Sequence, residues 1–210
     1  MKKKNPQDRE FGYKLLTPLM RPLFRFYYNP KVYGAEKIPK EGPIVIAGNH
    51  KHLFDQCITI MVTKRVIHYM AKKEYFDGKL APFFRFAGCI PVDRSRKDVS
   101  SAMAAMRVLK RGGAIGIFPE GTRNKTDQFL LRFKKGAVSL AKKSGALVVP
   151  FGIVGDYTFR SKNLAIRYGD PFSVEDMTVE EANQKLYNEV ERLMREGLAA
   201  EEKDLNLKDA

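Results

Sequence analysis

The sequence predicts an α/β fold: a single layered domain with a largely parallel mixed sheet flanked by helices, preceded by an N-terminal amphipathic helical segment. Three observations lead to this fold class. Short apolar runs of strand length alternate with helix-length segments over residues 43–168, as they do in parallel sheets. The 210 residues suit one domain with a buried core. The apolar and charged fractions, 44% and 30%, are ordinary for a folded protein.

Residues 1–30 form a segment of their own, with large apolar side chains at roughly helical spacing and cations between them. Pro18 and Pro22 interrupt the pattern, which predicts a kinked helix or two short ones. The first 40 residues hold ten Lys and Arg against three acids, a charge that anionic lipid attracts. We therefore favour a basic amphipathic membrane-association segment over an ordinary helix packed on the domain. Deleting residues 1–28 is expected to reduce membrane association more than it damages the fold.

The domain that follows, residues 31–210, is expected to alternate between strands and helices. The Gly and Pro content of residues 38–43 predicts a loop. Strands are expected at residues 43–47, 66–71, 88–92, 114–117, 146–154 and 164–168. Helices are expected at residues 54–63, 80–87, 97–111, 133–144 and 177–198. Gly112 and Gly145 end two of these helices, and Pro150 is expected to break the fifth strand.

The net charge of +14 predicts an anionic partner, either nucleic acid, a membrane surface or a phosphorylated substrate. The excess lies at the amino end and in the body, since residues 171–210 hold five Lys and Arg against eleven acids. No helix-turn-helix or aromatic-basic signature is present in the sequence, so we expect no nucleic-acid partner.

The two cysteines, Cys57 and Cys89, lie in apolar surroundings without metal-type spacing, which favours buried reduced thiols and a cytosolic setting. We expect no secretory signal, because Met1 and three lysines are followed by polar residues. We also expect no spanning helix, because no apolar run approaches about 20 residues.

The candidate catalytic pair is His50 and Asp55, at a corner between a predicted strand and a predicted helix. On a straight helix, residues five apart point away from each other, so the pair can meet only if His50 precedes the helix. A neutral imidazole oriented by a carboxylate can act as a general base. His52 is the alternative base. The interpretation that the pair is only a loop histidine beside an unrelated acid also remains open. The absence of a nearby serine argues against a Ser-His-Asp hydrolase, and no cluster resembles a zinc site.

Two arginines, Arg94 and Arg123, follow predicted strands. The carboxyl ends of strands are where α/β sheets bind ligands, and guanidinium groups bind phosphate bidentately. Glu120 can pair with one arginine or bind a substrate hydroxyl. A salt-bridged rim is the alternative for each arginine.

Four blocks of the sequence resemble, in order, those of the glycerolipid acyltransferases. They are Asn-His-x4-Asp at residues 49–55, Gly-Cys-Ile-Pro-Val-Asp-Arg at 88–94, Phe-Pro-Glu-Gly-Thr-Arg at 118–123 and Val-Val-Pro-Phe at 148–151. Most similar are the bacterial 1-acyl-sn-glycerol-3-phosphate (lysophosphatidate) acyltransferases. The first block alone is weakly specific, but four blocks in this order and spacing are highly specific.

The resemblance implies roles for individual residues, and it decides between the two histidines. It implies that His50 is the base and Asp55 its orienting partner. It also implies contacts with the glycerol phosphate of the substrate, from Arg94, Glu120, Gly121, Thr122, Arg123 and Lys134. No metal and no cofactor is expected besides the acyl donor.

The activity implied is transfer of a fatty acyl group from an acyl thioester to the 2-hydroxyl of lysophosphatidate, which forms phosphatidate in phospholipid synthesis. The donor implied is acyl-CoA or acyl carrier protein, and the latter would also be a protein partner. We expect a peripheral or monotopic protein at the cytoplasmic face of the cell membrane, bound to an anionic membrane surface. The alternatives are another acceptor, such as glycerol 3-phosphate or another lysolipid, and a non-catalytic basic peripheral membrane protein.

Overall fold

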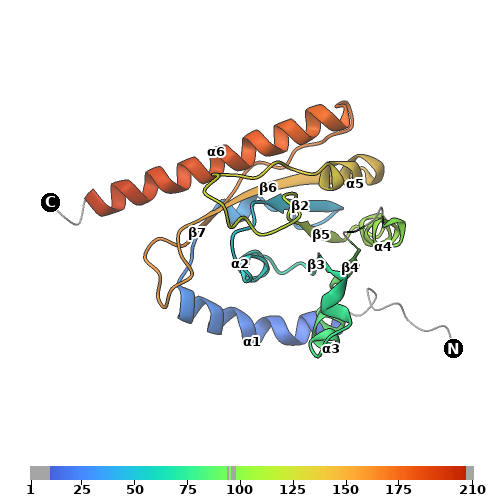
Figure 1. Ribbon diagram of the computed structural model, residues 1–210, viewed down its shortest axis with the longest axis horizontal. Coiled ribbons are helices and arrows are strands. Elements are labelled where there is room, and N and C mark those ends of the chain that lie inside the picture. The colour runs from blue at the N-terminus through green and yellow to red at the C-terminus, as the bar shows by residue number, and fades with distance from the viewer. Residues whose placement is uncertain (1–9, 94, 96–97, 207–210) are drawn as a thin grey trace.

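The computed structural model describes residues 10–93, 95 and 98–206, and a seven-stranded sheet runs through their centre (Figure 1). Its order is β1-β7-β6-β2-β5-β3-β4. The strands are β1 (Lys31–Tyr33), β2 (Ile44–Gly48), β3 (Ile67–Lys72), β4 (Ile90–Val92), β5 (Ala114–Ile117), β6 (Leu147–Val154) and β7 (Ala165–Tyr168). β7 is antiparallel to β6 and parallel to β1, whereas the other neighbours are parallel. The expected largely parallel mixed sheet is confirmed.

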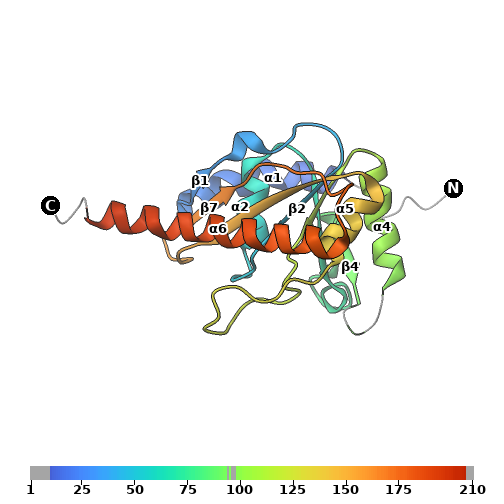
Figure 2. The same ribbon diagram turned by 90° about the horizontal axis from the view of Figure 1, so that it is seen from above.

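Helices cover both faces of this sheet. They are α1 (Glu10–Tyr28), α2 (Asp55–Val62), α3 (Ala81–Phe86), α4 (Val99–Lys110), α5 (Gly136–Ser144) and α6 (Val179–Asn206), with 3₁₀ turns at Ala35–Lys37 and Lys73–Phe76. In Figure 1, α5 and α6 lie above the sheet and α1 and α2 lie below it. Figure 2 shows α6 running across the molecule beside α5. The layered α/β architecture is therefore as expected.

The alternation of side chains along β2 explains why both faces are covered. Ile44 and Ile46 join a buried cluster that includes Phe24 of α1 and Ile58 of α2. Val45 and Ala47 join the opposite cluster, formed with α4, α5 and α6. A strand that is apolar on both sides must bury both, as central strands of parallel sheets do.

β6 is one continuous strand, so the expected break at Pro150 is wrong. On one side its ladder with β2 continues through the pair Ala47–Pro150. On the other side the carbonyl of Pro150 accepts the N–H of Gly169 at 2.9 Å, just beyond the end of β7. Because proline has no backbone N–H, one hydrogen bond is missing from the pairing with the segment after β7. This position lies at the end of that pairing, where the sheet tolerates the loss.

Three smaller differences concern the ends of the chain. β1 lies in a stretch where no strand was expected, and it pairs with β7, which is distant in sequence. The last helix continues to Asn206 instead of ending near residue 198. α1 is assigned as one helix through Pro18 and Pro22, where two short helices were an alternative.

α1 combines the two faces that the sequence left as alternatives. Tyr13 and Phe24 are buried against the domain, and Arg21 donates to the carbonyls of Ile60 and Thr63 at the end of α2. These contacts stabilise the helix despite its prolines. Its other face exposes large apolar side chains: Phe11, Leu15, Leu19, Met20, Leu23, Phe26 and Tyr27. Packing on the domain is confirmed for one face, and membrane association stays a prediction for the other.

The sheet topology brings three loops together. β6, β2 and β5 are adjacent and parallel, so their carboxyl ends meet at one edge. Gly48 ends β2 within close reach of β6, because a Cβ at this position would lie 2.2 Å from the carbonyl oxygen of Phe151. The strand therefore stays paired up to the residue before the corner at Asn49.

Candidate active site

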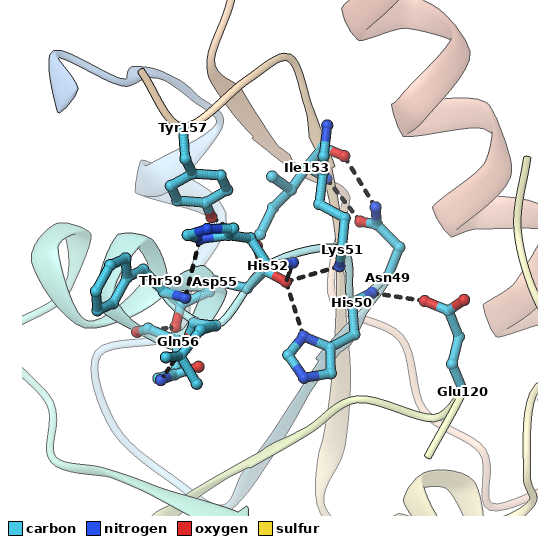
Figure 3. Close-up of polar contacts among 12 residues, drawn as sticks. Asn49, His50, Lys51, His52, Asp55, Gln56, Thr59, Glu120, Ile153 and Tyr157 are labelled. Carbon is cyan, nitrogen blue, oxygen red and sulfur yellow. Dashed lines mark hydrogen bonds and ion pairs between the residues drawn. The ribbon is translucent and has the colours of Figure 1, made fainter. Parts of the chain in front are cut away.

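His50 and Asp55 are in contact at the carboxyl end of β2. Asp55 is the first residue of α2, and its Oδ2 lies 2.7 Å from Nδ1 of His50 (Figure 3). The chain between them folds back as a corner, so His50 precedes the helix as expected. Nε2 of His50 has no hydrogen-bond partner among the described residues, and 14% of the side chain is exposed. The ring can therefore exchange a proton with a bound molecule at Nε2.

The Asp55 carboxylate is fully buried and receives three further donors. Oδ2 also accepts the backbone N–H groups of Lys51 and His52, each at 2.8 Å. Oδ1 accepts the hydroxyl of Tyr157 at 2.6 Å. A buried carboxylate needs such compensation. The arrangement can hold a negative charge beside the imidazole and stabilise its protonated form.

The ring and backbone of His50 are fixed by the loop that follows β5. The imidazole stacks on Phe118, with ring centres 4.0 Å apart and planes at 12°. Its backbone N–H donates to Glu120 Oε1 at 2.5 Å, and its carbonyl accepts the N–H of Asn124 at 2.7 Å. The corner carrying His50 is thus attached to the neighbouring loop at three points.

Glu120 connects backbone groups rather than facing open solvent. Its Oε2 accepts the N–H of Leu131 at 3.0 Å while Oε1 serves His50, and only 4% of the residue is exposed. Burial raises the pKa of Glu120, against the lowering by these two N–H groups. The implied contact with substrate stays a prediction.

Asn49 extends the β2–β6 ladder by its side chain. Its amide Nδ2 donates to the carbonyl of Ile153 at 2.9 Å, and its Oδ1 accepts the N–H of Ile153 at 2.7 Å. This pair of bonds replaces the backbone pairing that β2 leaves after Gly48. Asn49 is part of the first sequence block. The block alone does not predict that its side chain bonds to the backbone of β6.

The implied phosphate contacts lie in or beside the same loop. Arg123 is half-buried and Thr122 is exposed, and neither side chain has a hydrogen bond or ion pair within the described residues. Gly121 has a φ of +73°, and a Cβ there would lie 2.8 Å from Nζ of Lys134. Arg94 lies outside the described residues. Arg123 directly precedes Asn124, whose backbone N–H donates to the carbonyl of His50.

A cavity of ≈ 790 Å³ opens between α4, α5 and the sheet. Phe118, which stacks on His50, is part of its wall together with Gly121 and Lys134. Its other walls are mostly apolar, including Met70, Val92, Met103, Met106, Ile117 and Leu140. Four cations lie among the lining residues, namely Arg107, Lys110, Lys134 and Lys143. Such a space suits an apolar chain that carries an anionic or polar end.

His52 is directed elsewhere. Its ring stacks on Tyr157 at 4.1 Å, and only its backbone bonds to Asp55. Burial lowers the pKa of His52, and the charge of Arg123 adds to this. The contact geometry therefore favours His50 over its rival. Tyr157 was missed by sequence reasoning, because it lies in a loop about 100 residues away and belongs to none of the four blocks.

Potential metal ligands are dispersed among the described residues, and the two thiols are partly buried. No group of three or more His, Cys, Asp or Glu side chains in the described part of the chain could hold a metal ion. Cys57 and Cys89 are free, and burial raises the pKa of both thiols to about 12. Thiols of this kind are poor nucleophiles.

Comparison with known proteins bears on this site. A family model described as acyltransferase matches residues 29–154, which is more than half of the chain. The chain belongs to the acyltransferase family. The matched part of this acyltransferase includes His50, Asp55 and the loop carrying Glu120.

Two relatives are informative about the sequence of this acyltransferase. It is 31% identical over 170 residues to the 1-acyl-sn-glycerol-3-phosphate acyltransferase of Bacillus subtilis, covering 78% of this chain and 84% of the relative. It is 33% identical over 144 residues to the protein of the same name from Borreliella burgdorferi, covering 66% of this chain but only 56% of that longer relative.

The fold of the acyltransferase also has a solved counterpart. The crystal structure of the 1-acyl-sn-glycerophosphate (LPA) acyltransferase PlsC from Thermotoga maritima aligns with a TM-score of 0.73 over 93% of this chain and 83% of that one. The identity is 24%, so this likeness supports the fold and not the details of the site.

Proposed function

We propose that this acyltransferase moves a fatty acyl group from an acyl thioester to the 2-hydroxyl of lysophosphatidate, with His50 as general base. The observation that carries the proposal is the bond between Nδ1 of His50 and the buried Asp55, which leaves Nε2 unpaired among the described residues. The names of the relatives support lysophosphatidate as the acceptor.

The reaction is a direct transfer. Nε2 of His50 takes the proton of the acceptor hydroxyl as its oxygen attacks the thioester carbonyl. The tetrahedral intermediate collapses with loss of the thiolate, and the new ester bond replaces the carbon–sulfur bond. The imidazolium then gives its proton to the thiolate or to water, which regenerates the base. Asp55 stabilises the imidazolium formed in the first step and keeps Nδ1 protonated.

The phosphate of the acceptor is held by cations near His50. Arg123 and Lys134 make no side-chain hydrogen bond or ion pair within the described part of the chain, and Lys134 lines the cavity. A guanidinium binds phosphate through two parallel bonds. Arg94, Gly121, Thr122 and Glu120 complete the set that the family blocks imply. Fixing the acceptor by its phosphate presents the hydroxyl to His50 and so lowers the entropic part of the barrier.

The apolar cavity beside Phe118 takes a fatty acyl chain. Its largely apolar wall excludes water from the chain, and Phe118 in this wall stacks on the ring of the base. Acyl-CoA and acyl carrier protein both carry the required thioester on an anionic carrier, and a basic protein surface attracts either one.

The enzyme works at the cytoplasmic face of the cell membrane, bound to anionic lipid through the exposed face of α1. Phe11 and Leu19 on this face are 72% and 70% exposed. Among the described residues, no helix has the length and apolar character needed to cross a bilayer. Interfacial binding of an amphipathic helix suits this surface, and residues 31–210 then form the catalytic domain.

The acceptor is tested with purified protein and a panel of acceptors. Lysophosphatidate, glycerol 3-phosphate and lysophosphatidylcholine are each supplied with acyl-CoA or acyl carrier protein thioester. The expected result is acylation of lysophosphatidate with the highest kcat/KM. Preference for glycerol 3-phosphate would replace the acceptor, and no transfer to any acceptor would favour a non-catalytic membrane protein.

A further inference from the structure

Tyr157, which lies outside the four sequence blocks, donates a hydrogen bond to Asp55. Its hydroxyl donates to Oδ1 at 2.6 Å, whereas the three other donors to this carboxylate all bind Oδ2. Within the described residues, Oδ1 therefore depends on Tyr157 for its hydrogen bond. The residue follows the segment 29–154 that the family model matches.

We propose that Tyr157 is a positioning residue, whose hydroxyl fixes the plane of the Asp55 carboxylate and through it the ring of His50. A carboxylate can turn about the bond to its Cβ, and donors to one oxygen alone resist this rotation less than donors to both. With Oδ1 bound, Oδ2 stays directed at Nδ1 of His50. This inference rests on the proposed role of His50 as the base.

The hydroxyl of Tyr157 is suited to act only as a donor. Burial and the negative charge of Asp55 raise the pKa of Tyr157 far above its ordinary value. The phenol therefore keeps its proton at neutral pH. It does not compete with His50 for the substrate proton.

The ring of Tyr157 is itself held from two sides. It stacks on His52 at 4.1 Å, with planes at 20°, and it meets Tyr28 of α1 edge-on at 5.5 Å. Figure 3 shows Tyr157 and His50 approaching Asp55 from different directions. The aromatic contact with Tyr28 places the carboxyl end of α1, the proposed membrane helix, next to the residue that orients the base.

The test is Tyr157→Phe, which removes the hydroxyl and retains the ring. Acyl transfer to lysophosphatidate is measured per folded molecule, as judged by circular dichroism. We expect kcat to fall roughly tenfold or more, the usual effect of a lost bond to a charged group, with KM for both substrates little changed. Tyr168→Phe is the matched control, because Tyr168 is also buried but its hydroxyl has no partner in the described residues. It is expected to keep the wild-type kcat.

A double variant distinguishes positioning from an independent effect. If Tyr157 acts through the base, Tyr157→Phe has little further effect on the residual activity of His50→Ala. An equal loss in both backgrounds, or a rise in KM with an unchanged kcat, would overturn the positioning role. Wild-type kcat in Tyr157→Phe would do the same, provided that His50→Ala alone strongly lowers kcat. Full activity of His50→Ala would instead overturn the proposed function.

Discussion

At the scale of single residues, Glu120 shows that a motif residue can have a structural role that its sequence does not reveal. Both oxygens of its carboxylate accept backbone N–H groups, one from His50 and one from Leu131. The bonds join the corner of the base to the loop that carries the proposed phosphate contacts. The implied substrate contact and this connecting role make different predictions for one variant.

We expect Glu120→Gln to lower the free energy of unfolding by about 1–3 kcal/mol, because the amide NH₂ then faces one of the two backbone donors. Urea denaturation measures this change. The matched control is Glu175→Gln, at an exposed position, which is expected to leave stability within about 0.5 kcal/mol of wild type. Unchanged stability together with a raised KM for lysophosphatidate would indicate direct substrate binding instead.

At the scale of elements, α1 is both a packed helix and an exposed apolar surface. Because Tyr13 and Phe24 belong to the buried interior and Arg21 bonds to the end of α2, deleting the helix also removes part of the core. Substitutions on the exposed face separate membrane binding from stability better than deletion does.

We expect Leu19→Glu to weaken binding to vesicles containing phosphatidylglycerol by about tenfold or more. The variant loses one apolar side chain that would insert into the lipid, and it adds a negative charge facing an anionic membrane. Stability is expected to stay near wild type, because Leu19 is 70% exposed. Vesicle co-sedimentation at two salt concentrations measures the effect. Leu198→Glu serves as the control, because Leu198 is an exposed apolar residue of α6, and α6 lies on the opposite face of the sheet from α1. Equal binding by Leu19→Glu and wild type would rule out α1 as the membrane contact.

At the scale of the whole molecule, the sequence predicts the layered fold and most elements because their patterns are local. The apolar run of β2, the amphipathic pattern of α4 and the glycine after α5 each depend on a few neighbouring residues. β1 could not be predicted in this way, since it pairs with β7, which is remote in sequence. The continuity of β6 depends on its ladder with β2, which runs through Pro150 and is also distant in sequence.

The contacts of the candidate site also differ in whether a local pattern predicts them. The contact of His50 with Asp55 follows from a local strand-to-helix corner, and it is present. The bonds of Asn49, Glu120 and Tyr157 join residues that are 70 or more positions apart. A local sequence pattern cannot predict contacts between residues so far apart in the chain. The hydrogen bonds that hold the base in place are therefore visible only in the three-dimensional arrangement of β5, β2 and β6.

The central claim is that His50, and not His52, is the base, and kcat for phosphatidate formation tests it most directly. With saturating lysophosphatidate and acyl thioester, His50→Ala is expected to lower kcat by about 10²–10⁴. His52→Ala, whose ring contacts Tyr157 and not the Asp55 side chain, is expected to stay within about tenfold of wild type. Retention of wild-type kcat by folded His50→Ala, or a greater loss in His52→Ala, would contradict the assignment.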